Sequence, residues 1–556
     1  MVQGDMTADQ SPLPSRVISS RRVFPATQTR KGQATVTKLS VIDATVVRFG
    51  PCAAVWLYEQ GEAPHNSALF LDHLELSLRQ TLDSFPHFAG QVRWATKEDE
   101  VRPREDADPR YLGRPVVSYG SADDPGVGFV LAEYDRDLSD VVPGSEERKT
   151  TRKVWVATEF PQGELLPGCD LAFGPGMAHF EGLPGVAVQI TKFRCGGFAV
   201  GVTITHCLAD ALCLLTFVHS WAEHSRLLFE GSRDGSTHGQ ASRPMPVFDP
   251  ELLDRHAGLT RGTEPDAAKV EHARSLPMHR FDWWAKDAPG YPPWAEATTL
   301  TTKPGDEELQ KLQLSPSTFP PWQTWNPSAP VDHVQIRFGA DEVVRMKQAA
   351  QATISSGDVR ISRLDAVLAH MWVLINRARR LQDTAEPVYM NITLGLRSRV
   401  QPPLPDGFLG SPILLGHISQ PGSEVSPAAN STTTATTIGS VALSIREMMT
   451  RFTPEAVGAH LHDAAHEVSP QRLWQAFLGE RHTIVTSWTR AGAYEVDFVG
   501  SGVRPRYVQG KMPRMDGVLQ VMDDVAETGD FDVSLCMERE ATGRLLGDGM
   551  LRAYER

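Results

Sequence analysis

The segment 203–212 reads TITHCLADAL and places a histidine four residues before an aspartate. His206 ends a run of residues that favour β-strands, and Asp210 precedes a run with helical spacing. A neutral imidazole, whose ordinary pKa is about 6.5, can remove a proton from a hydroxyl group near neutral pH. The same imidazole could instead be a buried core histidine that hydrogen-bonds to a backbone carbonyl. The spacing alone therefore leaves two interpretations open.

Two predicted strands and a predicted helix would position this pair. Apolar residues alternate through 186–205, interrupted at 194–197 by the turn sequence RCGG, which predicts a β-hairpin. The alternation that begins at Phe198 places His206 on the inward, apolar face. After Asp210 the apolar period becomes that of a helix. The motif is therefore expected to connect the end of a core strand to the start of a helix.

Length and composition limit the classes of function. The chain has 556 residues, too many for one core, so at least two domains are expected. The net charge of −13 argues against general nucleic-acid binding, and no apolar run approaches the roughly 20 residues that span a membrane. The six cysteines have neither CxxC nor zinc-finger spacing, so no metal site is predicted. Because free thiols suit a reducing cytosol and no secretory signal is evident, we expect a cytoplasmic protein.

The chain divides into four predicted parts. Residues 1–35 are expected to be a flexible tail, and residues 36–250 an N-terminal α/β domain that carries the histidine motif. Residues 251–335 are rich in proline and tryptophan and predict a long crossover. Residues 336–556 predict a second α/β domain, in which 421–437 is poor in bulky apolar residues and is expected to be a flexible loop. Two such halves would leave a cleft or tunnel between them, where ligands commonly bind.

Several segments extend the histidine motif into an ordered set. They are LSVID at 39–43, LRQTLDSFPHFAGQV at 78–92, VQITKFRCGGFAVGVTITHCLADA at 188–211, SRLDAVLAHMWVLINRAR at 362–379, GLRSRVQPPLPDGFLGSP at 395–412, and TSWTR at 486–490 followed by YEVDFVGSG at 494–502. Together these segments resemble the BAHD acyltransferase family, the coenzyme A-dependent O- and N-acyltransferases of plant and fungal specialised metabolism. The serine-tryptophan spelling resembles the fungal branch, near the trichothecene acetyltransferases.

The resemblance implies a fold and a reaction. The fold would be α/β, with two chloramphenicol-acetyltransferase-like domains, each a mixed β-sheet with flanking helices, and an active-site tunnel between them. The cosubstrate would be an acyl-CoA, by family tendency acetyl-CoA, and no permanently bound cofactor is implied. The acceptor would be a hydroxyl group of a small fungal metabolite, although an amine is possible. The reaction would use a ternary complex without a covalent acyl-enzyme, and the protein would be a monomer.

The resemblance also assigns roles to the histidine motif. His206 would be the general base that takes the acceptor proton and returns it to the departing thiolate. Asp210 would be structural, because in the family this aspartate points away from the histidine and pairs with an arginine. The partner here is Arg397 or Arg399, and the sequence leaves that choice open. A helix N-cap role for Asp210 is compatible with the ion pair.

Two further pairs of residues receive roles in the same way. By resemblance, the indole N–H of Trp488 would contact the oxyanion in the tunnel, and Thr486, two residues earlier, would contact the acceptor. Trp488 could equally be a core tryptophan. Ser362 with Asp365 predicts a capping box at a helix start. Ser362 and Arg363 could bind the coenzyme A phosphates there, or could be an ordinary cap and a solvated arginine.

The chain departs from the family pattern at two places. The family usually has glycine after the motif's aspartate, where this chain has Ala211. The family's DFGWG motif reads DFVGSG from Asp497 onward, without the tryptophan. Because that motif is mainly structural in the family, Asp497 is expected to have a structural role, and the departure bears on loop geometry more than on catalysis.

Two alternative functions share the expected fold. A condensation-domain-like enzyme would use a carrier-protein thioester, but such domains usually have a second histidine directly before the motif, where this chain has Thr205. A non-catalytic binding protein of the same fold is the other alternative. The presence of both His206 and Asp210 argues against it.

Overall fold

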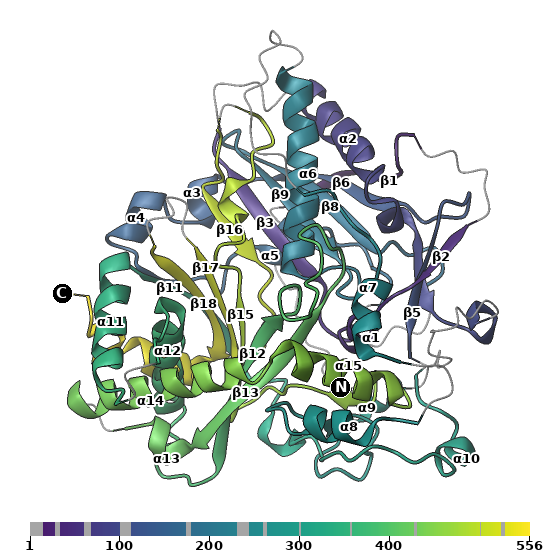
Figure 1. Cartoon of the computed structure of the whole chain (residues 1–556). Helices are drawn as coiled ribbons and strands as arrows, with labels where there is room; N and C mark the ends of the chain where they lie inside the picture. Colours follow the sequence, from purple (N-terminus) through teal and green to yellow (C-terminus); the bar gives the residue numbers. More distant parts are fainter. Residues whose placement is uncertain are drawn as a thin grey trace, which may run out of the picture.

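The computed structural model contains two mixed β-sheets with helices packed on their faces, which confirms the expected α/β fold (Figure 1). The structure describes residues 15–27, 34–60, 68–100, 113–173, 180–230, 244–259, 264–299, 302–355, 359–427, 431–500, 502–523 and 529–555.

The first sheet has six strands, of which β6 and β8 are parallel and the other neighbours antiparallel. In spatial order the strands are β1 (Ser15–Val23), β6 (Val127–Tyr134), β8 (Val186–Phe193), β9 (Phe198–Ile204), β3 (Cys52–Tyr58) and β16 (Tyr507–Gly510). Strands β8 and β9 are the predicted hairpin, and Gly196 in its turn has a φ of 85°, which favours glycine. Every residue of β9 is buried, so the alternating pattern runs through a strand covered on both faces.

Two long helices cover this sheet. Helix α2 (Ala68–Leu82) packs against α6 (Ala211–Glu230), and both lie at the top of the view in Figure 1. The apolar side of α6, including Leu214, Phe217 and Trp221, is buried in the core of the six-stranded sheet. Because α6 begins directly after the histidine motif, its packing fixes the direction in which the chain leaves β9.

The second sheet has seven strands and is also mixed. In spatial order they are β13 (Ile413–Pro421), β12 (Pro387–Gly395), β15 (His482–Ser487), β17 (Val518–Asp523), β18 (Phe531–Glu538), β11 (Val331–Phe338) and β7 (Val154–Val156). The helices packed with it are α11 (Ala340–Ala352), α12 (Arg363–Ala378), α14 (Ser431–Thr450) and α16 (Arg539–Leu546). The predicted capping box of Ser362 and Asp365 is confirmed at the start of α12.

Each half of the chain contributes a strand to the other sheet. Residues 154–156 form β7, which pairs with β11 at the edge of the seven-stranded sheet. Residues 507–510 form β16, which pairs with β3 at the edge of the six-stranded sheet. Boundaries at 36–250 and 336–556 therefore separate two sequence halves but not the two sheets. The exchanged strands tie the two halves of the chain together.

Two sequence predictions of flexible segments are wrong. Within the predicted tail 1–35, residues 15–23 form strand β1 and pair along β6, because the strand extends the six-stranded sheet. Within the predicted loop 421–437, the described residues form the short helix α13 (Gly422–Val425) and the first turns of α14. Small residues such as Ser and Thr are tolerated in a helix that later buries apolar side chains such as Ile438 and Val441.

The crossover 251–335 packs its tryptophans together. Trp283, Trp284 and Trp322 are buried with Phe281 and Phe477 in one cluster. The secondary-structure elements that lie wholly within the crossover are short. The remaining α-helices and strands of the fold, those of the crossover included, are α1 (Val41–Thr45), α3 (Leu138–Val141), α4 (Ser145–Lys149), α5 (Gln162–Leu165), α7 (Glu251–Asp254), α8 (Ala267–Arg274), α9 (Pro293–Ala297), α10 (Asp306–Leu309), α15 (Pro454–His466), the antiparallel two-stranded sheet of β10 (Phe281–Asp282) and β14 (Leu473–Trp474), and the small sheet β2 (Thr35–Lys38), β5 (Pro115–Tyr119) and β4 (Gln91–Trp94). In the described part of the chain no helix combines the length and apolarity needed to cross a membrane.

Candidate active site

His206 lies in the short connection between β9 and α6, and its ring is partly exposed. Its Nδ1 atom is 3.1 Å from the hydroxyl oxygen of Ser411. The edge-on ring of Phe49 lies 5.3 Å away, measured between ring centroids. Burial lowers the pKa of His206 below its ordinary value, while its own backbone carbonyl and the charge of Asp210 act in the opposite direction. The ring is therefore neutral at physiological pH, the form that can accept a proton.

Asp210 is committed to Arg397 and to the start of α6. One carboxylate oxygen accepts the backbone N–H of Cys213 at 2.9 Å, which caps the helix. The guanidinium of Arg397 donates to both carboxylate oxygens, at 2.5 and 3.0 Å. Although burial lowers the pKa of Arg397, attraction to Asp210 raises it overall. Asp210 thus anchors the turn around His206 through a largely buried, bidentate ion pair.

The two candidate arginines point to different places. Arg397 also donates through Nε to the carbonyl of Phe408 at 3.2 Å. Arg399 instead donates to the carbonyls of Met449 and Phe452, both at 3.2 Å. The geometry therefore selects Arg397 as the partner of Asp210. Both arginines follow the end of β12 in a turn, so a two-residue offset does not place them on one face as it would in a strand.

Ser411 and Asp43 have no role that the sequence predicts, yet Ser411 contacts His206 and Asp43 contacts Ser411. The backbone N–H of Ser411 donates to one carboxylate oxygen of Asp43 at 2.7 Å. The other oxygen of Asp43 accepts from Ser40, from its N–H at 3.0 Å and its hydroxyl at 2.6 Å. Burial raises the pKa of Asp43 to about 6. The only signal in the sequence is the spelling S-x-x-D in LSVID, which is typical of a capping box and says nothing about Ser411.

Thr486 and Trp488 lie at the end of β15, in the seven-stranded sheet. Thr486 is half-buried, whereas Trp488 is 6% exposed and packs in the apolar core of the six-stranded sheet. The backbone N–H of Trp488 donates to the carbonyl of Val521 at 2.8 Å. In the described residues neither side chain hydrogen-bonds to His206. Trp488 therefore spans the junction of the two sheets as a packed side chain.

Ser362 and Arg363 lie at the N-terminus of α12. The hydroxyl of Ser362 accepts the N–H of Asp365 at 3.1 Å, so it is used in its own cap. Arg363 is exposed and lines an open groove of about 520 Å³. Lys347 and Arg360 line the same groove. These cations make it a place where a phosphate could bind.

Asp497 stabilises the turn that replaces the family's glycine-rich motif. Its carboxylate accepts the backbone N–H groups of Val499, Gly500 and Gly502, at 3.0, 2.7 and 3.0 Å. Both glycines have a positive φ, of 91° and 73°, which this tight turn requires. These three described residues are therefore held by hydrogen bonds to Asp497 in spite of the altered spelling.

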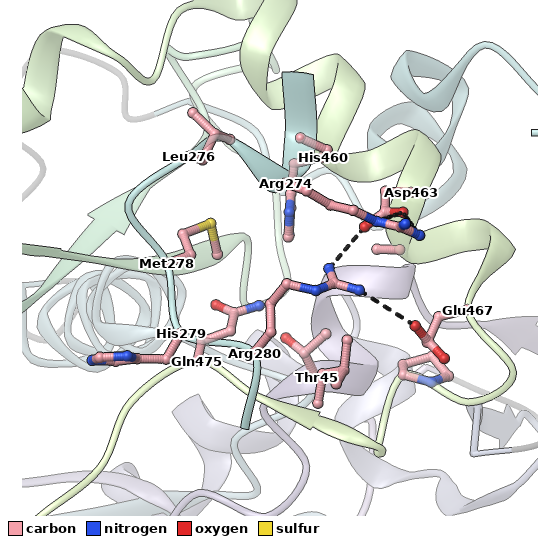
Figure 2. A pocket seen from close by; sticks show the side chains of 14 residues that line it. Thr45, Arg274, Leu276, Met278, His279, Arg280, His460, Asp463, Glu467 and Gln475 are labelled. Carbon is pink, nitrogen blue, oxygen red and sulfur yellow. Dashed lines mark hydrogen bonds and ion pairs between the residues drawn. The ribbon is translucent and has the colours of Figure 1, made fainter. Parts of the chain in front are cut away.

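A small cavity of about 40 Å³ lies near the site, between α1, α8 and α15 (Figure 2). Arg280 extends across it and pairs with Asp463 at 2.8 Å and with Glu467 at 3.7 Å. Leu473 also lines it, whereas the adjacent Trp474 contacts Phe49 beside His206. A space of this size holds one or two water molecules, so we assign it no substrate.

The surroundings of His206 on the other side are aromatic. Phe49 contacts Trp474 with ring centroids 5.1 Å apart, and Trp474 contacts Trp283 at 5.2 Å. The histidine thus contacts a polar corner, formed by Ser411 and Asp43, and an aromatic cluster of Phe49, Trp474 and Trp283, of which only Trp283 belongs to the crossover. A neutral histidine held in this way can accept a proton from a substrate that packs against aromatic rings.

Comparison with known proteins identifies relatives along most of the chain. The model of the Transferase family matches residues 121–233 and 284–545. The protein "Acyltransferase AFT15-1" of Alternaria alternata is 25% identical over 464 residues, which cover 82% of this chain and 80% of the relative. "Putrescine hydroxycinnamoyltransferase 1" of Oryza sativa subsp. japonica is 25% identical over 522 residues, which cover 91% of this chain and 92% of the relative.

Solved structures share the fold at low identity. F. graminearum TRI101 in complex with coenzyme A and deoxynivalenol has a TM-score of 0.63 and 15% identity, with 94% of this chain and 99% of that chain covered. Vinorine synthase has a TM-score of 0.56 and 17% identity, with 96% and 98% covered. The condensation domain of the polyketide synthase MokA has a TM-score of 0.51 and 12% identity, with 94% and 97% covered. The fold therefore occurs both in a protein that binds coenzyme A and in a condensation domain, and it does not distinguish these two possibilities for this chain.

Proposed function

The chain belongs to the Transferase family and is an acyltransferase, and on this premise we propose that it transfers an acyl group from coenzyme A to a hydroxyl group of a small molecule, with His206 as general base. The observation that carries the proposal is the position of His206 at the junction of the two sheets, with one ring nitrogen held by Ser411. The lowered pKa of His206 supports the same role, because the ring is then free to accept a proton at neutral pH.

The proposed reaction needs one proton carrier. The Nε2 atom of His206 takes the proton of the acceptor hydroxyl as its oxygen attacks the thioester carbonyl. The tetrahedral intermediate collapses, the carbon–sulfur bond breaks, and the thiolate of coenzyme A takes the proton back from the imidazolium. The products are the ester and free coenzyme A, and no acyl group is bound to the enzyme. The indole of Trp488 is proposed as a donor to the oxyanion, and Thr486 as a contact for the acceptor.

The groove at the start of α12 is the proposed site for the coenzyme A phosphates. Lys347, Arg360 and Arg363 supply positive charge on its walls. The N-terminus of α12, capped by Ser362, adds the partial positive charge of its backbone N–H groups. The negative net charge of the chain does not oppose this proposal, because the phosphates would be attracted by the nearby cations of the groove.

The acyl group and the acceptor are proposed by chemistry and by relatives. Aromatic contacts among Phe49, Trp474 and Trp283 beside His206 favour an apolar acceptor that presents a hydroxyl group. The fungal relative and the TRI101 complex with deoxynivalenol favour a hydroxylated specialised metabolite. Acetyl is the proposed acyl group, by the tendency of the fungal enzymes that the sequence resembles.

The proposal is tested by release of free thiol. Purified protein is incubated with acetyl-CoA and a panel of hydroxylated terpenoids and polyketides, and product formation is checked by mass spectrometry. His206→Ala should lower kcat by about 10²- to 10⁴-fold, because the general base is lost. The control is His272→Ala, which changes an exposed histidine on α8 and should leave kcat unchanged.

Two outcomes would overturn the proposal. Thiol release that persists unchanged in His206→Ala would remove the catalytic role of His206. Acyl transfer from a carrier-protein thioester, with none from free coenzyme A thioesters, would favour the condensation-domain-like alternative.

A further inference from the structure

Two oxygen atoms act on the ring of His206. The hydroxyl oxygen of Ser411 lies 3.1 Å from Nδ1, and the backbone carbonyl of His206 itself raises the pKa of the ring by accepting a hydrogen bond. A residue's own carbonyl can be reached by its Nδ1 atom but not by the more distant Nε2 atom. Because a carbonyl only accepts hydrogen bonds, this contact favours the tautomer with the proton on Nδ1.

We propose that Ser411 and Asp43 are positioning residues, which hold His206 in the tautomer that leaves the Nε2 lone pair free for the acceptor proton. In this arrangement the Nδ1–H group donates to the Ser411 oxygen, and Asp43 holds Ser411 in place through its backbone N–H, at 2.7 Å. The inference rests on the proposed function, because a free Nε2 lone pair matters only if His206 is the general base.

The environment of Asp43 is unusual for a residue that only caps a helix. It is 1% exposed, accepts three hydrogen bonds and has no ion-pair partner in the described part of the chain. Asp365 occupies the same position in the other S-x-x-D capping box, but it pairs with Arg446. Helix α1, which Asp43 caps, has only five residues. An uncompensated buried carboxylate is costly, and such costs are concentrated at functional sites.

Other charged groups face Asp43 and enter any measurement of pH dependence. Asp254, on α7, raises the pKa of Asp43 slightly, and burial raises the pKa of Asp254 itself. Arg397 and the thiols of Cys207 and Cys213 also interact with the Asp43 charge. The two thiols have strongly raised pKa values and stay neutral, and Arg397 stays charged, so Asp254 is the other acid to be controlled.

The main test is Ser411→Ala, which removes the hydroxyl and little volume. We expect kcat to fall about 10- to 100-fold, the scale found when a hydrogen-bond partner that orients a metal-bound histidine is removed. We also expect the acid limb of the kcat/KM profile to move to lower pH, because the imidazolium loses an acceptor. Ser411→Thr retains the hydroxyl and should recover part of the activity. An unchanged kcat and an unchanged acid limb in Ser411→Ala would overturn the proposal.

Asp43→Asn extends the test to the second residue. It should lower kcat, because an amide oxygen holds the N–H of Ser411 less firmly than the carboxylate oxygen does. Glu342→Gln is the matched control, since Glu342 is a buried carboxylate in the first turn of α11 whose pKa burial raises. That variant should lose stability but keep kcat, and Asp254→Asn measures how much of any change in pH dependence comes from Asp254. If Asp43→Asn lost stability but kept kcat, Asp43 would serve only the capping box of α1, and its positioning role would be overturned.

A tautomer measurement separates this inference from the proposed function. In protein labelled with ¹⁵N-histidine, the His206 signals are identified by their loss in His206→Ala. We expect shifts of the Nδ1–H tautomer in the unaltered chain and a mixture in Ser411→Ala. If His206→Ala abolishes activity while the Ser411→Ala spectrum is unchanged, the general base stands and the positioning role fails. If His206→Ala remains active, the proposed function itself fails.

Discussion

Two aspartates near His206 differ in their distance from it along the chain and in the groups that their carboxylates contact. Asp210 follows the histidine by four residues, yet its carboxylate is bound to Arg397 and to the first turn of α6. Asp43 lies far earlier in the chain, yet it reaches the histidine through Ser411, which is 205 residues from His206 and 368 from Asp43. Asp210, which is near in the sequence, holds the turn after His206, whereas Asp43, which is far in the sequence, contacts the residue that hydrogen-bonds to the ring nitrogen.

The difference lies in how each charge is compensated. Asp210 has a bidentate arginine partner, so its site is an ion pair that loses stability when either member is removed. Asp43 is held only by hydrogen bonds, and burial raises its pKa to about 6. Gly410 joins the two sites, because its carbonyl accepts from the N–H of Asp210 at 3.1 Å and a Cβ added to it would meet the carboxylate of Asp43. A change in one site can therefore be separated from a change in the other only by matched variants.

The largest effect is expected at the ion pair. Arg397→Ala leaves the Asp210 carboxylate buried without its partner and should lower the free energy of unfolding by about 3–5 kcal/mol. Guanidinium denaturation followed by tryptophan fluorescence measures the change. In the protein that stays folded the acid limb should not move to lower pH, because the Asp210 charge that raises the pKa of His206 is retained.

Arg399→Ala is the matched control for that variant. Its guanidinium donates to two neutral carbonyls, of Met449 and Phe452, so its loss should cost about 1 kcal/mol. Equal losses in the two variants would show that the Asp210 pair adds nothing beyond ordinary hydrogen bonds.

A pH effect of intermediate size is expected at Asp43. Its pKa is raised from 3.8 to about 6 in the folded chain, so the folded state binds the proton more tightly than the unfolded state. The stability that this group contributes is present below pH 4 and is lost as pH rises to 6, by about 3 kcal/mol at 1.4 kcal/mol for each pKa unit. The stability lost in Asp43→Asn should therefore be larger at pH 4 than at pH 7, measured by urea unfolding at both values.

Comparison with the unaltered chain isolates this effect from the buried histidines. Burial lowers the pKa of His87 to about 3 and of His370 to about 4, and such groups favour the folded state more as pH rises from 4 to 6.5. They contribute equally to both proteins and cancel in the difference. A difference that is constant between pH 4 and pH 7 would contradict the raised pKa of Asp43.

The smallest effect is expected where the two sites meet. Gly410 has a φ of 129°, and an added Cβ would lie 3.2 Å from a carboxylate oxygen of Asp43. Gly410→Ala should therefore lower the unfolding free energy by about 2 kcal/mol through backbone strain, and should also lower kcat through Ser411. Thermal unfolding and steady-state kinetics measure the two changes.

Gly395→Ala is the control for that change. Gly395 ends β12, has nothing within 4 Å of an added Cβ, and lacks a positive φ. Its replacement should leave stability unchanged or raise it by up to about 1 kcal/mol, because the unfolded chain loses freedom. Equal changes in stability and kcat in the two variants would show that Gly410 does not couple the Asp210 site to the Asp43 site.

Local patterns in the sequence predicted much of what surrounds His206. The alternation before the motif and the helical spacing after it give β9 and α6, because side-chain periodicity follows directly from backbone geometry. The capping box at Ser362 is equally local. Residues 15–23 were misjudged for the opposite reason, since strand β1 depends on its distant partner β6 and has exposed residues along most of its length.

The partners of the histidine motif could not be predicted from the sequence. Arg397 and Arg399 are equivalent in spelling, and only the turn after β12 directs the first toward Asp210 and the second toward α14. Nothing in the letters around Ser411 indicates that its hydroxyl meets a histidine from the other half of the chain. The exchange of β7 and β16 between the sheets was likewise invisible, because each strand is short and pairs across a long sequence separation.

The sequence by itself determined the family, the α/β class, and a histidine at the end of a core strand, because these follow from residue order and local periodicity. Only the tertiary structure decided which groups stand beside that histidine. Asp43 comes from one distant segment and Arg397 and Ser411 from another, and their contacts arise when two sheets pack and enclose buried polar groups that must find hydrogen-bond partners. That requirement depends on the whole fold, so no local pattern encodes it.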